Sequence, residues 1–165
     1  MRKLVSGSRL RLLALACALV SLGAASPDAK KVIPESEFEV VRSELVLVHG
    51  LETKAPRFER AKKVPLKPGT SFGWLVELKT RKPRIKWREE FALPAAPKTW
   101  GPTEKQDRRR ISEDKKVSVI EREVEPERGL IFNFWTLAEG DPAGRYTFRI
   151  FVEGVRVATF EFDVE

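Results

Sequence analysis

Apolar and polar residues alternate with a period of two in two stretches near the middle of the chain. In each stretch nearly every second residue has a large apolar side chain. In the second stretch most of the residues between them are charged. This period is typical of a β-strand with one face toward a core and one toward water. The apolar residues of the two stretches are Phe72, Trp74, Val76, Leu78, Ile85, Trp87, Phe91 and Leu93.

Five further segments have the same character, so the pattern predicts about seven strands separated by Pro- and Gly-containing turns. No segment has apolar residues at the i, i+3, i+4, i+7 spacing of an amphipathic helix over three turns. We therefore expect an all-β protein, an antiparallel sandwich or barrel. The expected strands lie in 38–50, 72–78, 85–93, 116–126 and 129–137, with two more in 144–165.

The first and last of these segments carry more specific signals. A change of face near Arg42 predicts a β-bulge or two short strands, with Val41, Leu45 and Leu47 on one side and Val46 and Val48 on the other. At the C-terminus, Glu153-Gly154 predicts a two-residue hairpin turn between two strands. The expected inward residues there are Tyr146, Phe148, Ile150, Val152, Ala158, Phe160, Phe162 and Val164.

The first 25 residues have the composition of a secretory signal peptide. Four basic residues precede an apolar run over 12–22, and Gly23 and Ala25 supply the small side chains for cleavage after Ala25. We expect an exported protein, periplasmic or extracellular, with a mobile polar lead-in over 26–37 and one domain over 38–165. A lipoprotein-type cut before Cys17 is the alternative, which Ala14 three positions earlier disfavours.

Removing this leader changes the composition that matters. The whole chain has a net charge of +7, whereas residues 26–165 retain 27 basic and 24 acidic residues, a net charge of +3. The single Cys and the single Met of the sequence also lie in the leader. The expected domain therefore has no thiol for a disulfide, a nucleophile or a thiolate metal site, and its stability must come from packing.

The segment from Asp141-Pro142 to Phe148 resembles the tyrosine corner of immunoglobulin-like sandwiches, with Tyr146 two residues after Gly144. The resemblance implies that the Tyr146 hydroxyl bonds upstream backbone, that Phe148 takes the place of the second core cysteine, and that Trp87 is the buried tryptophan. More broadly, the motifs FNFWTLAEGDPAGRYTFRIFVEGVRVATFEFDV, GTSFGWLVELK and TWGP resemble a family of short exported bacterial proteins of unknown function. That family, matched from about Phe38 onward, brings no catalytic residues.

Few residues offer catalytic chemistry. His49 is the only histidine, and we expect it to be solvated or bonded to backbone rather than to act as a general base. Glu89 and Glu90 are adjacent, so a strand places them on opposite faces and they cannot form a dyad. Glu89 then falls on the apolar face, which predicts either an Arg partner at the sheet margin or a bulge that turns it outward.

Metal binding is equally weakly indicated. Glu121, Glu123 and Glu125 alternate along one strand face, but calcium usually takes six to eight oxygens from a compact loop. We interpret them as a charged outer face that discourages edge pairing. The sequence therefore predicts a protein that is not an enzyme and that holds no metal or cofactor.

Two basic segments remain, 80–88 and 107–116, each near a tryptophan. The second lies in the irregular, Pro-containing connection 94–116, and connections of this length are often functional. We expect ligand contact there, through Trp100, Arg108, Arg109 and Arg110. The leading hypothesis is a non-enzymatic envelope module with a binding or scaffolding role, whose partner is a protein or an anionic polymer rather than nucleic acid. An inhibitor or accessory subunit of an exported enzyme is the alternative, and a hydrolase is a third.

Overall fold

The computed structural model describes residues 37–102, 105 and 107–165. The predicted signal peptide, Cys17 and the predicted lead-in, except for Glu37, lie outside this range. The described residues form ten strands: β1 (Phe38–His49), β2 (Arg57–Arg60), β3 (Lys63–Val64), β4 (Ser71–Thr80), β5 (Ile85–Ala92), β6 (Arg108–Ile111), β7 (Val117–Val124), β8 (Leu130–Thr136), β9 (Gly144–Val152) and β10 (Val155–Val164).

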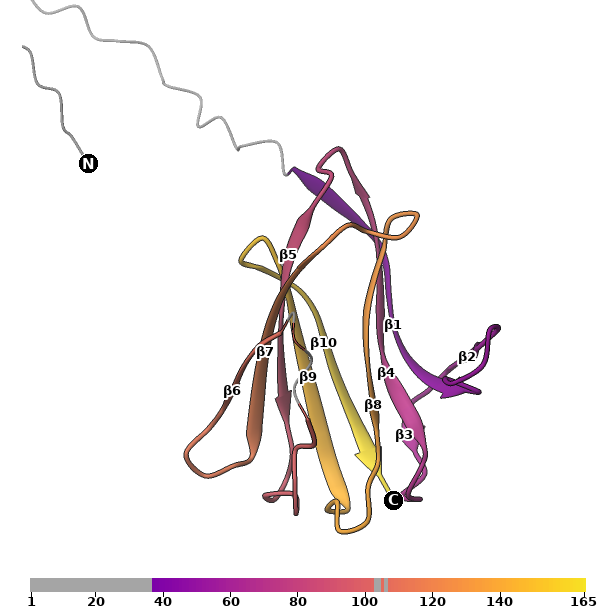
Figure 1. Cartoon of the computed structure of the whole chain (residues 1–165), viewed down its shortest axis with the longest axis vertical. Helices are drawn as coiled ribbons and strands as arrows, with labels where there is room; N and C mark the ends of the chain where they lie inside the picture. The colour runs from indigo at the N-terminus through magenta and orange to yellow at the C-terminus, as the bar shows by residue number, and fades with distance from the viewer. Residues whose placement is uncertain (1–36, 103–104, 106) are drawn as a thin grey trace, which may run out of the picture. The chain divides into compact units, whose positions relative to one another are not determined.

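The strands form two sheets, with the orders β2-β1-β4-β8 and β3-β10-β9-β5-β7-β6. Figure 1 shows β4 and β8 on one side of the domain and β5, β7 and β9 on the other. All pairings are antiparallel except the short parallel pairing of β3 with β10. The prediction of an all-β antiparallel sandwich is confirmed.

All seven predicted strands are present, and three short ones were not predicted. These are β2, β3 and β6, each no longer than four residues; β2 and β6 are mostly exposed, whereas β3 buries Val64 in the core. The third corrects the expectation that 94–116 is irregular throughout, because Arg108–Ile111 pairs with β7. Four residues of which three are arginines carry no apolar alternation, so nothing in the pattern marked β6 as a strand.

The predicted irregularity in β1 is a β-bulge. The register of β1 on β4 shifts between Val40 and Arg42, which leaves Val41 as the extra residue. Val41 is 55% exposed, so the prediction that it shares a face with Leu45 was wrong, since the bulge inverts the alternation between them. Leu45, beyond the bulge, belongs to the core.

The core lies between the sheets and is rich in aromatic rings. Trp74 of β4 and Trp87 of β5 meet edge to face, with centroids 5.3 Å apart, and Phe91 stacks on Phe148 at 4.3 Å. Such pairs add to the free energy gained from burial. The predicted inward residues of β4 and β9 are all buried, as are Ile85, Trp87, Phe91 and Leu93 of the β5 segment. No disulfide is needed to hold the two sheets together.

The C-terminal hairpin forms as predicted. Val152 pairs with Val155, and Glu153 and Gly154 have φ angles of 49° and 82°, the left-handed values of a tight two-residue turn. Of the predicted inward residues only Phe160 is half-buried rather than buried.

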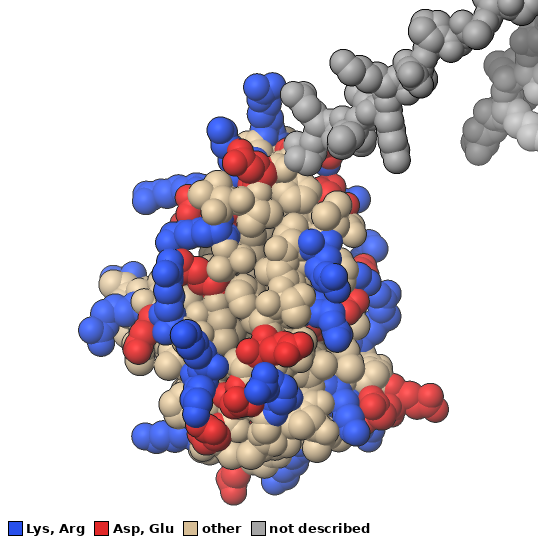
Figure 2. All heavy atoms as spheres, turned by 180° about the vertical axis from the view of Figure 1, so that it is seen from behind, with Lys and Arg blue, Asp and Glu red and all other residues tan. Residues whose placement is uncertain are grey.

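Figure 2 shows charges of both signs around an uncharged strip on the face that it presents.

The tyrosine corner is also present. The Tyr146 hydroxyl donates to the carbonyl oxygen of Pro142, 2.7 Å away, while the ring packs against Phe91 and Phe162. Burial raises the pKa of the phenol, so it stays protonated and acts as a donor. This bond fixes the loop between β8 and β9 to the start of β9.

Replacing Tyr146 by Phe removes only the hydroxyl and leaves the Pro142 carbonyl without its donor. We expect the free energy of unfolding to fall by about 1 kcal/mol, the usual net value of one hydrogen bond. Tyr146→Ala, which also removes the buried ring, should cost about 3–5 kcal/mol. Urea unfolding of both variants measures this, and an unchanged midpoint for Tyr146→Phe would show that the corner does not stabilise the fold.

Candidate functional site

The strand β6 separates the three arginines that the sequence grouped together. Arg108 and Arg110 point outward and are exposed, and Arg110 forms an ion pair with Glu121 at 2.9 Å. Arg109 points toward the space between the sheets and is half-buried. The predicted four-residue contact surface is therefore divided: Arg109 joins Trp100 on the inner side, and the other two arginines lie on the outer face.

Arg109 holds the loop that carries Trp100. Its guanidinium donates to the carbonyl oxygens of Trp100, Gly101 and Pro102, the last two at 3.2 and 3.0 Å. It also lies over the rings of Trp100 and Trp135, 5.9 and 5.5 Å from their centroids. The Trp100 indole in turn donates to the Lys115 carbonyl at 2.9 Å. These contacts fix the position of a ring that sequence alone placed in a free loop.

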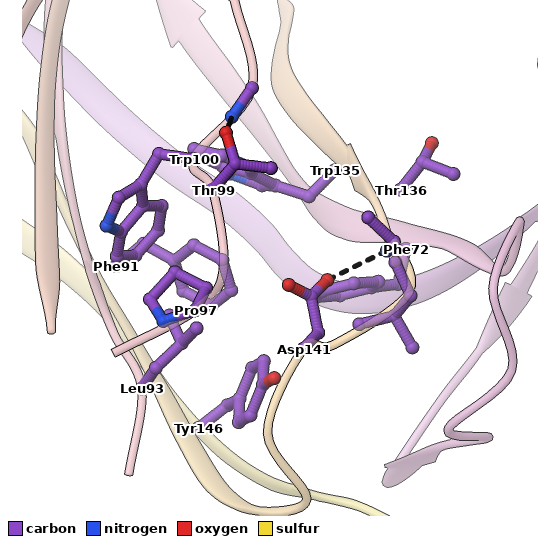
Figure 3. A pocket seen from close by; sticks show the side chains of 13 residues that line it. Phe72, Phe91, Leu93, Pro97, Thr99, Trp100, Trp135, Thr136, Asp141 and Tyr146 are labelled. Atoms are coloured by element: carbon purple, nitrogen blue, oxygen red, sulfur yellow. Dashed lines mark hydrogen bonds between the residues drawn. The ribbon is translucent and has the colours of Figure 1, made fainter. Parts of the chain in front are cut away.

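An aromatic pocket of about 100 Å³ opens beside this loop. Figure 3 shows the rings of Phe91, Trp100 and Trp135 arranged around it, with Tyr146 on its far side. The Phe91 ring is 5.8 Å from that of Trp100 and 5.0 Å from that of Trp135, and the two indoles are 5.7 Å apart. The pocket thus has aromatic walls on several sides.

The polar side chains that line the aromatic pocket already have hydrogen-bond partners. The Asp141 carboxylate accepts from the backbone N–H of Ala138 at 2.8 Å, and Thr99 accepts from that of Gly101 at 3.0 Å. The Thr136 hydroxyl pairs with that of Ser71, and the Tyr146 hydroxyl with Pro142. The pocket therefore offers an occupant mainly apolar and aromatic contact.

Glu89 of β5 supports this pocket from within the core. Its side chain is fully buried, and its carboxylate accepts hydrogen bonds from the indoles of Trp74 and Trp135 and from the amide of Asn133, with the last two at 2.9 and 3.1 Å. Neither an Arg at the sheet margin nor a bulge accounts for it, so both predictions were wrong. The apolar alternation around Glu89 was the signal for burial, but its three donors come from other strands.

Burial raises the pKa of the Glu89 carboxyl, and the charge of Asp107 raises it further, while the three donors oppose the shift. Asp107, whose side chain is 5% exposed, forms an ion pair with Arg122, and the Arg122 guanidinium lies 5.3 Å from the Trp87 ring centroid. Burial also lowers the pKa of Arg109, against the charges of Asp107 and Glu89. Glu89, Asp107, Arg109 and Arg122 therefore form one cluster of charged groups on or beside β5, β6 and β7.

The other candidate residues lie elsewhere and have ordinary partners. His49 is exposed to solvent, as expected, on the β1–β2 hairpin, where its ring is hydrogen-bonded to Glu59 at 2.9 Å. Glu90 lies on the face opposite Glu89, as predicted, near Arg88 and Arg149. The three alternating glutamates are ion-paired with Arg110 or Arg84. No group of three or more metal-binding side chains occurs within 37–102, 105 and 107–165.

The tyrosine corner, the buried tryptophan and the two facing sheets define an immunoglobulin-like β-sandwich. The chain belongs to the PM0630 β-sandwich domain family, whose sequence profile matches residues 43–165. An immunoglobulin-like protein from Pseudomonas aeruginosa has a similar structure, with a TM-score of 0.57 and 17% sequence identity over 80% of this chain and 99% of that one. No curated protein matches the sequence. The part of the chain that the structure describes contains no helix long and apolar enough to cross a membrane.

Because burial raises the pKa of Glu89, this residue makes the free energy of unfolding fall as pH rises. Its folded pKa lies above the ordinary value of 4.5, so its contribution to stability is fully present below that value and is lost as pH rises toward the folded pKa. Glu89→Gln cannot ionise, and it should lose this dependence. We therefore expect wild-type protein to lose stability relative to Glu89→Gln between acid and neutral pH, measured by urea unfolding; parallel pH profiles would contradict this.

A second replacement tests the hydrogen bonds themselves. Glu89→Leu leaves the indole N–H groups of Trp74 and Trp135 buried without an acceptor, which costs about 1–3 kcal/mol for each group. We expect this variant to be less stable than Glu89→Gln at every pH, because the Gln carbonyl keeps at least one acceptor in place. Equal stability of the two variants would show that the donors find other partners.

Proposed function

We propose that the protein is an exported, non-enzymatic binding module of the bacterial envelope that receives one apolar side chain of a protein partner in the aromatic pocket. Export is supported only by the signal-peptide composition of the first 25 residues. The single observation that supports the binding role is a preformed pocket walled by Phe91, Trp100 and Trp135, in which the polar lining side chains are already hydrogen-bonded. Aromatic pockets of this kind bind by exclusion of water and ring contact.

The size of the pocket favours a side chain over a free small molecule. Sites for drug-sized ligands have volumes of about 300–1,000 Å³, whereas this pocket has about 100 Å³. An engineered apolar cavity of about 150 Å³ in another protein accommodates benzene. A leucine side chain or a single aromatic ring that enters partly is therefore the largest group that fits, and the rest of the partner must lie across the surrounding loops.

Rigid support of the walls favours affinity. Glu89 fixes the Trp135 indole, and Arg109 fixes the loop backbone around Trp100. Because these side chains are already ordered, binding does not have to pay for ordering them. The same pocket would serve the alternative role, an inhibitor or accessory subunit, if the partner were an exported enzyme; a pull-down from periplasmic extract that returns a single hydrolase would favour that alternative.

The pocket can be tested with p-cresol, which has one aromatic ring. We expect p-cresol to bind and to shift the NMR signals of the Trp100 and Trp135 indoles. Trp100→Ala removes one wall and should weaken binding roughly tenfold, which corresponds to about 1.4 kcal/mol. Ala138→Phe should block binding at the exposed mouth of the pocket without removing a core contact.

Phe132→Ala is the matched control, because Phe132 is a 40% exposed aromatic residue on the outer face of β8 and does not line the pocket. It should leave p-cresol binding unchanged. Binding that persists in both Trp100→Ala and Ala138→Phe would place the ligand elsewhere and remove the support for this function.

A further inference from the structure

The two basic segments of the sequence meet on the outer face of the six-stranded sheet. Lys86 and Arg88 point outward from β5 because Ile85, Trp87 and Glu89 between and beside them are buried. Arg108 points outward from β6, and β7 lies between the two strands. A groove of about 700 Å³ runs over this surface, lined by charged residues of all three strands and by Arg84 just before β5.

The register of the strands sets the spacing of these cations. In the register of the sheet, Glu121 of β7 lies opposite Arg88 of β5 on one side and opposite Arg108 of β6 on the other. The two arginines therefore lie two strands apart in one row. This corresponds to roughly 10 Å, since neighbouring strands are about 4.8 Å apart. Lys86 lies two residues along β5 from Arg88, roughly 7 Å away. The positive charges thus extend in two directions across the groove.

The acidic residues of the groove are already neutralised. Glu121 is ion-paired with Arg110 at 2.9 Å, and Glu123 with Arg84 at 3.2 Å. The Arg88 guanidinium lies over the Phe151 ring, 4.0 Å from its centroid, and 3.3 Å from Glu90. None of the ion pairs among the described residues involves Lys86 or Arg108. These two cations therefore remain available to an anion.

We propose that this groove binds a linear polymer that carries phosphate groups and no bases. Two separated cations suit successive charges along one chain better than a single phosphate ion. Proteins that bind single-stranded nucleic acid without sequence preference add exposed aromatic rings on which bases stack. Here Trp87 is only 2% exposed and Phe151 is covered by Arg88, so the groove offers charge without a stacking surface.

The proposal goes beyond the aromatic pocket, which has a different lining and needs no charge. The probe is long-chain inorganic polyphosphate, titrated into the protein at low salt and followed by isothermal calorimetry. We expect binding that weakens as salt is raised, as counterion release requires. The double variant Lys86→Gln/Arg108→Gln should lose roughly tenfold or more in affinity.

The double variant Lys54→Gln/Arg57→Gln is the matched control, because it removes the same charge from the exposed β1–β2 hairpin. It should change polyphosphate affinity by less than roughly threefold. An equal loss of polyphosphate affinity in both double variants would show attraction to net charge only, and it would overturn the assignment of the binding site to the groove. Thermal unfolding of each variant checks that the fold is retained, and p-cresol binding checks that the pocket is intact.

Two further probes separate the sources of phosphate. Orthophosphate at the same total phosphate concentration should compete poorly, because it cannot reach both cations at once. Oligo(dT) of equal charge should bind no more tightly than polyphosphate, since its bases find no stacking surface. Tighter binding of oligo(dT) that depends on Lys86 and Arg108, or full competition by orthophosphate, would overturn the assignment to a base-free polymer.

Discussion

The carboxylate of Glu89 links the two sheets, and the position of the Trp135 indole beside the aromatic pocket depends on it. It belongs to β5 of one sheet, while its donors Trp74, Asn133 and Trp135 belong to β4 and β8 of the other. A buried carboxylate is costly unless it is hydrogen-bonded, so the sheets are stable together only when these donors reach it. The orientation of the Trp135 indole, and with it one wall of the aromatic pocket, follows from this requirement.

The short strand β6 connects the two proposed binding sites. Its alternation directs Arg109 inward, against the loop of Trp100, and Arg108 outward, into the groove beside β7. The pocket is apolar and sized for one side chain, whereas the groove is open and charged. A module with both could hold a protein partner by an anchor side chain and lie against an anionic polymer through the outer face of a sheet.

The sequence predicted Trp100 and Arg109 as parts of a site, but it could not place them. It suggested a free loop, because Pro, Gly and charged residues between 94 and 116 carry no alternation. The structure makes Trp100 one wall of a pocket whose other walls, Phe91 and Trp135, come from strands β5 and β8 of the two different sheets. Those two residues were predicted only as strand residues, since spacing along the chain contains no information about which strands become neighbours in space.

The sequence by itself determined the all-β class, the seven main strands, an irregularity in β1 and the C-terminal turn, while the tyrosine corner was implied by the resemblance to immunoglobulin-like sandwiches. These features depend on local alternation and on backbone preferences of a few adjacent residues. Only the tertiary structure decided that Glu89 is buried with three donors, that Val41 faces outward, and that two basic segments form one groove. Each of these depends on which side chains from distant strands meet, and the pairing of strands is a property of the whole domain.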